Sequence, residues 1–450
     1  MQKTFVLDTS VLLRDPYAPL TGFDDNIVVV PGPVLQDLER MTQGPGSEEA
    51  TDALRVLGEI QKTANLSECI DTIGGGKMYF CSEGVEYNNL PRAFSLKSID
   101  NQIISICVHL KKSAKRKDAE VILVTNKVSL RVNAGVCGIK AEEYRNSVIE
   151  DSGYTGYQTV ECDPGFIDAI YASEGRAIPC PEHMHFTENE FVTFKCGSQS
   201  AMTVYRKGQL VCIQDKELCG WIQARNNLQK YAMWALTQPA SEIPLVILLG
   251  PAGTAKTFLS LAAGMDGTYT TQKRISRESQ YNKITLSRPV AESYQELGFL
   301  PGGLDDKLAP LLASYYDNME ILLGGKDNKE EREQILMQMQ DILDSGVVEL
   351  CGLTFIRGRS FVNTYFICDE AQNATPTRIR DVISRAGEGT KIVICGDPGQ
   401  IDVPTLDKNN NGLIYAVEHM KGSPYCAIVK FTEHESVRSK LAREVVKRMS

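Results

Sequence analysis

The chain has 450 residues, which at roughly 150 residues per domain predicts about three domains rather than one hydrophobic core. Apolar residues make up 42% of the sequence and charged residues 23%, a composition that excludes wholesale disorder. Because 57 Asp and Glu residues outnumber 48 Lys and Arg residues, the net charge is −9, and any nucleic-acid binding must depend on local basic groups.

No membrane or secretion signal is present in the pattern of apolar residues. The longest apolar run near the middle, Leu245 to Leu249, is far shorter than the ~18 residues that span a bilayer. Near the N-terminus, Asp8 interrupts the apolar residues before a signal-peptide core can form. Thirteen cysteines without a C-x-x-C pair predict reduced thiols. We therefore expect a soluble cytoplasmic protein without membrane contact.

The coarse pattern of strands and helices divides the chain into three parts. Residues 1–147 alternate strand-like and helix-like segments, which predicts a parallel sheet covered by helices on both faces. Residues 148–219 contain short alternating runs among Gly, Pro and Ser, which predict a small β-rich connector. The α/β pattern returns over residues 220–450, so the predicted fold class is α/β throughout the two larger parts.

The strongest local signal is a buried strand, a glycine-rich turn and a helix start between residues 245 and 263, the order that a P-loop requires. Lys256 would reach the outer phosphates of ATP, and the Thr257 hydroxyl would hold Mg²⁺. Ala255 stands where the pattern has Gly, and its methyl would crowd the phosphate if the turn requires a positive φ. The predicted ATP-binding residues of this turn are Gly250, Pro251, Ala252, Gly253, Thr254, Ala255, Lys256 and Thr257.

Two later strands also end in polar groups. We expect Asp369 to bind Mg²⁺ through water and Glu370 to orient and deprotonate the attacking water. Asp397 and Gln400, which follow the next strand, are expected to face the γ-phosphate. Three such strands in this order predict an ATP-hydrolysing motor. A small-molecule kinase is a less favoured alternative, because the adjacent acids suit activation of water better than phosphoryl transfer to a metabolite.

The boxes Asp369-Glu370-Ala371-Gln372 and Gly396-Asp397-Pro398-x-Gln400 are similar to the core of superfamily-one helicases. Over residues 220–450 the sequence resembles the PhoH-like ATPases, which have a single RecA-like P-loop domain. This resemblance implies that Gln229 reads the adenine and that Arg438 is an arginine finger. It also implies that three arginines at strand ends contact nucleic acid, with ion pairs inside the domain as the alternative for each: Arg288, Arg357 and Arg359.

Residues 1–147 resemble a PIN domain, so that the whole chain resembles a PIN–PhoH fusion. In PIN nucleases, acids from separate elements bind Mg²⁺ or Mn²⁺, which activates water against an RNA phosphodiester. Asp8, Asp37 and Asp100 match three of these acids, and Asp37 stands where the longer Glu is usual. Lys127 stands where the fourth acid is usual, and its ammonium would compensate the acids' charge instead of ligating metal.

Nuclease activity stays open at this point, because three acids can still hold one metal. A second alternative is that Asp8 and Asp100 only cap helices. The leading interpretation is an ATP-hydrolysing RNA remodeller or helicase, acting on single-stranded RNA or a tailed duplex, fused to a weakened PIN ribonuclease-like module. A single RecA-like domain implies a ring-shaped homo-oligomer in which a neighbour completes the ATP site. The alternative is an ATP-switched RNA-binding regulator with a catalytically dead PIN domain.

Overall fold

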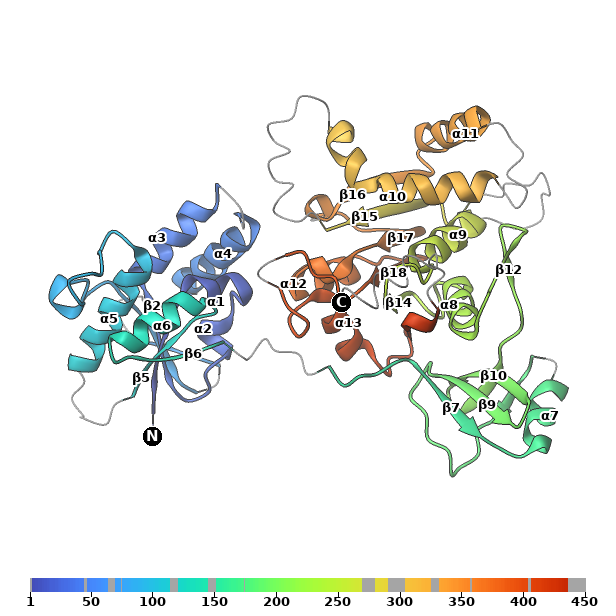
Figure 1. The fold of residues 1–450 in the computed structure, drawn as a ribbon, viewed down its shortest axis with the longest axis horizontal. Helices are drawn as coiled ribbons and strands as arrows, with labels where there is room; N and C mark the ends of the chain where they lie inside the picture. Colours follow the sequence, from blue (N-terminus) through green and yellow to red (C-terminus); the bar gives the residue numbers. More distant parts are fainter. Residues whose placement is uncertain are drawn as a thin grey trace. The chain divides into compact units, whose positions relative to one another are not determined.

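The computed structural model confirms a mixed α/β fold with parallel sheets and divides the chain into two compact units, residues 1–148 and 149–450 (Figure 1). Among the helices that the model describes, none has the length and apolar character needed to cross a bilayer. The described residues are 2–43, 47–63, 69–73, 75–113, 120–144, 151–173, 175–268, 280–289, 304–324, 332–356, 358–403 and 406–435.

A six-stranded sheet forms the centre of the first unit, in the order β3-β4-β2-β1-β5-β6. All neighbouring strands are parallel except β3 and β4. The strands are β1 (Thr4–Leu7), β2 (Ile27–Pro31), β3 (Ile70–Asp71), β4 (Lys77–Cys81), β5 (Val121–Val124) and β6 (Lys140–Glu142). The helices are α1 (Thr9–Arg14), α2 (Ala18–Thr21), α3 (Gly32–Met41), α4 (Ser47–Thr63), η1 (Tyr87–Asn89), α5 (Ile99–Ser113) and α6 (Val128–Val136).

The core of the first unit is built on its central strands, β1, β2 and β5. Val6 of β1 pairs with Val29 on one side and with Leu123 on the other, and all three side chains are buried. Continuous apolar strands of this kind are typical of parallel sheets that helices cover on both faces. The carboxyl ends of β1 and β5 consequently lie side by side at one edge of the sheet, where Asp8 and Lys127 follow them.

The second unit begins with a smaller, mostly antiparallel sheet in the order β7-β9-β10-β11-β8, on which α7 packs. Phe191 of this sheet stacks on Tyr231 of α8, with ring centroids 4.6 Å apart. The small sheet therefore shares a hydrophobic core with the larger part of the unit. Its elements are β7 (Tyr157–Glu161), α7 (Pro164–Ala172), β8 (Ala177–Pro179), β9 (Phe191–Cys196), β10 (Gln199–Arg206) and β11 (Gln209–Cys212).

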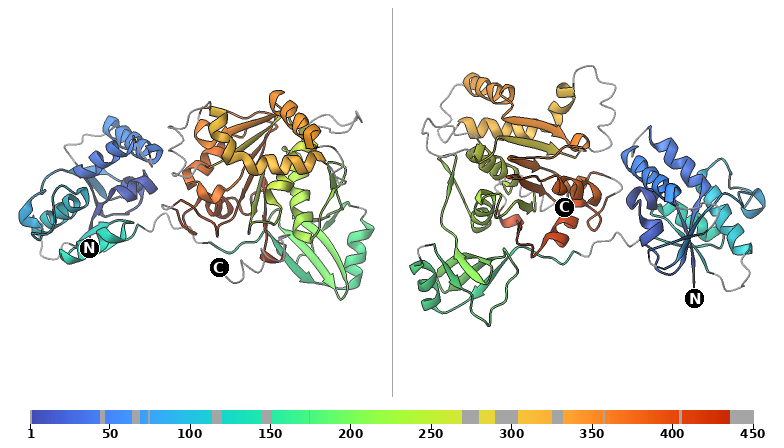
Figure 2. Two further views of the ribbon diagram at one scale, coloured as in Figure 1. Left: turned by 45° about the horizontal axis from the view of Figure 1, so that its top comes forward. Right: turned by 180° about the vertical axis from the view of Figure 1, so that it is seen from behind.

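A second six-stranded sheet, entirely parallel, has the order β16-β15-β17-β18-β14-β19. Helices α8 to α11 pack on one face and α12 and α13 on the other (Figures 1 and 2). Its strands are β14 (Leu245–Leu249), β15 (Lys283–Arg288), β16 (Val348–Gly352), β17 (Thr364–Cys368), β18 (Lys391–Gly396) and β19 (Cys426–Lys430), preceded by the short pair β12 (Glu217–Leu218) and β13 (Ile222–Gln223). Its helices are α8 (Asn227–Thr237), α9 (Lys256–Thr268), α10 (Leu304–Gly324), α11 (Arg332–Asp344), η3 (Leu353–Ile356), η4 (Ala371–Asn373), α12 (Pro376–Ser384), α13 (Gly412–Met420) and η5 (Glu433–Glu435).

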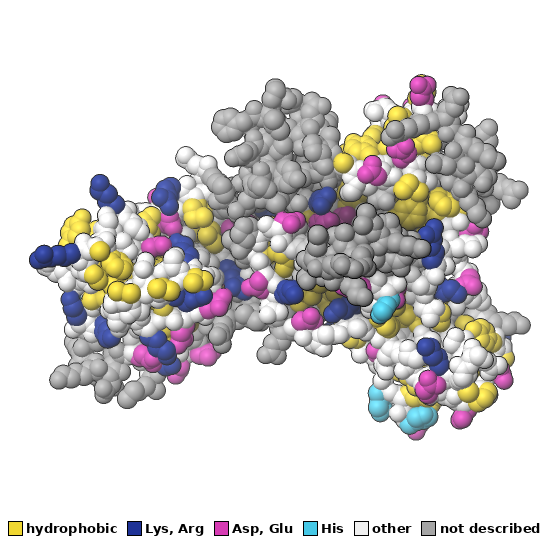
Figure 3. Space-filling view, in the orientation of Figure 1, with side chains coloured by type: hydrophobic (Ala, Val, Ile, Leu, Met, Phe, Trp, Pro, Cys, Tyr) yellow, Lys and Arg dark blue, Asp and Glu magenta, His cyan; other side chains and the backbone are white. Residues whose placement is uncertain are grey.

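Surface charge is mixed on the face shown in Figure 3, where both basic and acidic side chains lie on the described parts of each unit. This distribution agrees with the net charge of −9. Nucleic-acid contact would therefore depend on a few placed groups rather than on the overall field.

Candidate nucleotide and metal sites

The glycine-rich turn lies between β14 and α9, where a buried strand delivers the chain to the carboxyl edge of the parallel sheet. Three residues of this turn have positive φ: Gly250 at 139°, Gly253 at 84° and Ala255 at 71°. The first two are glycines, which adopt such angles without steric cost. Ala255 adopts a left-handed conformation that costs a residue with a Cβ about 1 kcal/mol. The positive φ of Ala255 is thus the condition under which the sequence analysis expects its methyl group to crowd the phosphate.

Lys256 is the buried cation of this turn. Its ammonium donates to the carbonyl oxygens of Gly250 at 2.7 Å and Pro251 at 2.9 Å. The hydroxyl of Thr254 lies 3.4 Å from the same nitrogen. Burial lowers the pKa of Lys256 from its ordinary value, although the thiol of Cys395 and the nearby carboxylates oppose that shift. The oxygens of the turn are neutral. An anion bound there, such as a phosphate, would give the ammonium a negatively charged partner.

Thr257 and Asp369 meet at the next position along the edge. The Thr257 hydroxyl donates to Oδ2 of Asp369 at 2.9 Å, across 112 positions of sequence. Burial raises the pKa of Asp369, and the neighbouring charge of Glu370 adds to that shift. A hydroxyl and a desolvated carboxylate oxygen are oxygen donors of the kind that Mg²⁺ takes in ATP sites. The two side chains therefore fit Mg²⁺, and they would be its protein ligands.

Glu370 follows Asp369 directly and has a left-handed backbone, with φ 54° and ψ 35°. Its carboxylate is held from two sides. Nη2 of Arg288 lies 3.3 Å from Oε1, and Nε2 of Gln372 donates to Oε2 at 2.5 Å. Strained backbone at a residue with two such restraints is typical of functional positions. Arg288 thus forms the ion pair inside the domain that was the alternative to nucleic-acid contact.

Gln372 is a site residue that the sequence analysis missed. It is fully buried, and its amide contacts three of the predicted site residues. Besides Glu370, Nε2 donates to the Gln400 carbonyl at 2.9 Å, and Oε1 accepts from the Asp397 backbone N–H at 3.0 Å. Its place in the Asp-Glu-Ala-Gln box was the available signal. Gln372 therefore connects the strand ends of β17 and β18 directly.

These groups surround a cavity of about 220 Å³ at the edge of the sheet. Asn318 of α10 and Phe258 of α9 also line it, and no sequence motif indicated either residue. Gln229 is buried on α8, where its Oε1 accepts from the Arg225 backbone N–H at 2.9 Å, and it is outside the set of described lining residues. The described residues that line the cavity are Ala252, Gly253, Ala255, Lys256, Thr257, Phe258, Asn318, Asp369, Glu370, Gly396, Asp397 and Gln400.

Of the other three arginines singled out in the sequence, the structure describes one, Arg359. Nη2 of Arg359 lies 2.7 Å from Oε1 of Glu349, so that this arginine also forms an ion pair inside the domain. Arg357 and Arg438 lie outside the described residues.

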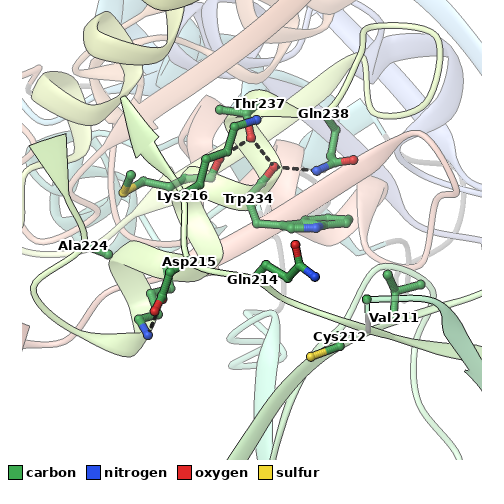
Figure 4. A pocket seen from close by; sticks show the side chains of 12 residues that line it. Val211, Cys212, Gln214, Asp215, Lys216, Ala224, Trp234, Thr237 and Gln238 are labelled. Atoms are coloured by element: carbon green, nitrogen blue, oxygen red, sulfur yellow. Dashed lines mark hydrogen bonds and ion pairs between the residues drawn. The ribbon is translucent and has the colours of Figure 1, made fainter. Parts of the chain in front are cut away.

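A second cavity of the same unit, about 430 Å³, lies between the small sheet and α8 (Figure 4). Gln214 lies beside the indole of Trp234 in this view, and the Gln238 amide donates to the Trp234 carbonyl at 3.0 Å. The carbonyl of Gln238, which lines this cavity, accepts from the ammonium of buried Lys391 at 2.8 Å, and the Ile243 carbonyl accepts from the same nitrogen at 2.8 Å. Lys391 begins β18, whereas the phosphate site lies at the other end of that strand, about 15 Å away. The described residues that line this cavity include none of those that line the cavity at the P-loop, so the two cavities are separate.

Buried thiols lie beneath the nucleotide site. Cys368 immediately precedes Asp369, and Cys395 lies in the neighbouring strand β18 with its Sγ 3.3 Å from the Ser260 hydroxyl. Burial raises the pKa of Cys395 to about 12 and that of Cys368 well above its ordinary value. Both thiols are therefore protonated at neutral pH and behave as part of the core.

In the first unit, Asp8 is fully buried and caps α1. Its Oδ2 accepts from the Ser10 backbone N–H at 3.2 Å, the Ser10 hydroxyl at 2.6 Å and the Thr125 hydroxyl at 2.9 Å. The capping alternative is thus present for Asp8. A cap does not account for its other oxygen, because Oδ1 has no hydrogen-bond partner among the described residues and faces Lys127 at 3.6 Å.

Lys127 lies between two of the predicted metal ligands. Its ammonium is 2.9 Å from Oδ1 of Asp100 and 3.6 Å from Oδ1 of Asp8. Burial disfavours the charged form of Lys127, but the two carboxylates outweigh it and raise its pKa above the ordinary value. Asp37, the third acid, pairs with Arg40 at 2.7 Å. Over the described residues, no group of three or more acids, histidines or cysteines is arranged to hold a metal ion. The acids therefore do not fit a PIN metal centre while Lys127 lies among them.

Comparison with known proteins agrees with this division of the chain. A family model described as "PhoH-like protein" matches residues 221–450, and one described as "PIN domain" matches residues 5–145. Protein PhoH2 of Bacillus subtilis (strain 168) is 33% identical over 455 residues, which cover 98% of this chain and 99% of that protein. Protein PhoH2 of Thermobispora bispora is 30% identical, covering 96% and 94% of the two chains. Among solved structures, the cytoplasmic domain of the type VII secretion ATPase EccC from Thermomonospora curvata covers 97% of this chain and 49% of its own at 11% identity, but a TM-score of 0.17 carries no argument.

Proposed function

Since this chain belongs to the PhoH-like family of P-loop ATPases and has an N-terminal PIN domain, we propose that its ATPase remodels RNA that the PIN module also contacts. The PIN–PhoH fusion predicted from the sequence is confirmed. The single observation that carries the proposal is the contact of Thr257 with Asp369 beside Glu370, at the mouth of a P-loop.

The residues of this site divide the work of hydrolysis among them. Lys256, already at the turn's carbonyls, would move a short distance to the outer phosphates of ATP. Thr257 and Asp369 would hold Mg²⁺, which supplies charge neutralisation to the β- and γ-phosphates. Glu370 would accept the proton of the attacking water, with Gln372 fixing the direction of its carboxylate.

Arg288 is the residue that would connect RNA to ATP. It ends strand β15 at the same sheet edge, and it holds the carboxylate of Glu370 at 3.3 Å. If the guanidinium of Arg288 turned to an RNA phosphate, the Glu370 carboxylate would lose its contact with Arg288 and keep its hydrogen bond from Gln372. RNA binding would thus change the position of the general base. The proposed result is hydrolysis that single-stranded RNA stimulates.

Completion of the ATP site by a neighbouring copy is part of the proposal. The family's single RecA-like domain has no second domain to close over the nucleotide. We therefore propose a ring-shaped homo-oligomer in which Arg438 acts as the arginine finger, either for its own copy's ATP site or for that of a neighbour. Loss of such a finger typically costs about 10³-fold or more in hydrolysis rate.

The deciding experiment measures ATP hydrolysis with and without single-stranded RNA, for the wild type and for Glu370→Gln. Glu388→Gln is the matched control, because Glu388 is exposed on the same domain. We expect RNA to stimulate the wild type and the control, and Glu370→Gln to bind ATP without turnover. Hydrolysis that Glu370→Gln retains would rule out the assigned base, and hydrolysis that ignores RNA would rule out the RNA motor.

The role of Arg288 is tested with Arg288→Ala, and Arg380→Ala, an exposed arginine of α12, serves as the control. We expect Arg288→Ala to abolish RNA stimulation and to reduce the salt dependence of RNA affinity by about one phosphate contact. Unchanged RNA affinity at every salt concentration would remove Arg288 from the proposed RNA contact.

A second candidate function is an ATP-switched RNA-binding regulator with an inactive PIN domain. Two observations favour it, the left-handed Ala255 in the phosphate loop and Lys127 among the PIN acids. ATP binding that changes RNA affinity without any turnover would select this function over the motor. The same reactions, run with labelled RNA in Mg²⁺ and in Mn²⁺, test the PIN site separately. If that site is inactive, the RNA stays intact under either function.

A further inference from the structure

The carboxyl edge of the first sheet brings two acids, Asp8 and Asp100, together with Lys127. Asp8 follows β1 and Lys127 follows the adjacent parallel strand β5, and the Asp8 backbone N–H donates to the Val124 carbonyl at 3.0 Å. Asp100 reaches the same edge from the first turn of α5. The fold therefore places the ammonium of Lys127 at the position where these acids converge.

The two oxygens of Asp8 have different partners. Three donors from Ser10 and Thr125 occupy Oδ2 and fix the orientation of the carboxylate. Oδ1 is buried and has no hydrogen-bond donor among the described residues, which leaves it for a cation. The ammonium of Lys127 lies 3.6 Å from this oxygen. A carboxylate oriented in this way is prepared for a positive charge, and the chain itself supplies one.

The other two acids also have cations of the chain. Asp100 accepts from the Lys127 ammonium at 2.9 Å, and Asp37 pairs with the guanidinium of Arg40 at 2.7 Å. A divalent ion at the shared position would lie within a few ångströms of an ammonium group and would be strongly repelled. It would also have to displace hydrogen-bonded partners from carboxylates that are already compensated.

We infer that Lys127 is a tethered cation that takes the place of the divalent metal in the PIN site. The first unit is then held together at this edge without Mg²⁺ or Mn²⁺, and hydrolysis of RNA by a metal-bound water is absent from it. This inference goes beyond the proposed ATPase function and does not depend on it, because it concerns only residues of the first unit.

The test measures binding of Mn²⁺ to the full chain by the loss of the free-ion electron paramagnetic resonance signal, without nucleotide. All variants carry Asp369→Asn, which removes a proposed metal ligand of the ATP site. We compare Lys127→Asp with Lys140→Asp, because Lys140 also pairs with two carboxylates, Glu120 and Glu142, but at the surface. Lys127→Asp is expected to gain one Mn²⁺ per chain, at least about tenfold tighter than Lys140→Asp and the unsubstituted first unit.

Two results would overturn the inference. One is a Mn²⁺ ion bound by the chain with Lys127 intact and lost on Asp100→Asn. The other is a folded Lys127→Asp chain that gains no Mn²⁺. If Lys127→Asp does not fold, Lys127→Met decides the matter by thermal denaturation. Its midpoint is expected to rise on addition of Mn²⁺, because Asp8 and Asp100 then lack their lysine, and an unchanged midpoint would contradict the inference.

Discussion

Lys127 and Lys256 stand at the carboxyl edges of two parallel sheets in one chain, yet their surroundings differ. Lys127 lies between two carboxylates, which raise its pKa. Lys256 contacts carbonyl and hydroxyl oxygens, and burial lowers its pKa. The first ammonium is already neutralised by the protein. The second is desolvated without a carboxylate among its hydrogen-bond partners, which favours an anionic ligand. The comparison teaches that the partners of a lysine at the carboxyl edge of a parallel sheet, rather than its place in the fold, decide whether it stabilises the structure or is available to bind a substrate.

The largest effect is expected at the lysine that lacks a carboxylate partner. Lys256→Met should lower ATP hydrolysis at least about 100-fold, because the outer phosphates lose their cation. Phosphate release measures the rate, and Lys195→Met, at an exposed position of β9, is the control for loss of a positive charge. A Lys256→Met rate above about a tenth of the wild-type rate would contradict the assignment.

A double-mutant cycle tests the other lysine. Lys127→Met and Asp8→Asn should each destabilise the first unit by roughly 2 kcal/mol. The first leaves the buried carboxylate of Asp8 without its cation, and the second leaves the ammonium of Lys127 with Asp100 as its remaining carboxylate at this edge. The double variant should cost less than the sum, with a coupling of about 1 kcal/mol or more. Hydrogen exchange of the amides in β1 and β5 measures the local free energy of opening. Additive effects would show that the two groups do not interact.

Lys391 sharpens the comparison because, like Lys256, it is buried and donates to backbone carbonyls, but it lies at the other end of β18 from the nucleotide site. Burial lowers the pKa of Lys391 from 10.5 to about 7. Between these values the unfolded chain binds more protons, so stability of the second unit should rise with pH. Relative to Lys391→Met, the wild type should gain about 1 kcal/mol between pH 7 and 8. Both tryptophans lie in this unit, so that urea unfolding followed by their fluorescence is the measurement. Parallel pH profiles of the two proteins would disprove the shift.

The smallest effect is expected at Ala255. Ala255→Gly relieves the left-handed strain but increases the entropy of the unfolded chain, so stability should change by less than about 0.5 kcal/mol. Hydrolysis should stay within about threefold of the wild type if the methyl leaves the phosphates room. A tenfold or larger increase in rate, which corresponds to about 1.4 kcal/mol of activation free energy, would instead mean that the methyl crowds the phosphate.

The sequence was informative wherever chemistry lies next to a strand in the chain. The P-loop and the box after β17 are local patterns, and the parallel order of their strands brings Thr257 to Asp369. The mixed α/β fold was predictable for the same reason, since buried apolar strands such as β5 and β14 are continuous in sequence.

Contacts between side chains from distant elements were not predictable. Nothing local indicates that Asn318 of α10 lines the nucleotide cavity, or that Phe191 stacks on Tyr231 and joins the small sheet to α8. The charge compensation by Lys127 was foreseen as chemistry, but its distances to Asp8 and Asp100 depend on the packing of α5 against β5. The acids with which Arg288 and Arg359 form ion pairs, Glu370 and Glu349, likewise lie elsewhere in the sequence.

The buried thiols of this chain can report how fast the core of each unit opens. Cys107 and Cys395 lie in the cores of the two units, and burial raises the pKa of both above the ordinary thiol value. An alkylating reagent reacts with the thiolate, so it reaches Cys107 of α5 and Cys395 of β18 only after the surrounding core opens. Cys69, which is exposed, reacts without that delay and serves as the internal standard. The rates at which Cys107 and Cys395 are alkylated therefore measure the opening of the two cores separately, and no cysteine has to be introduced for the measurement.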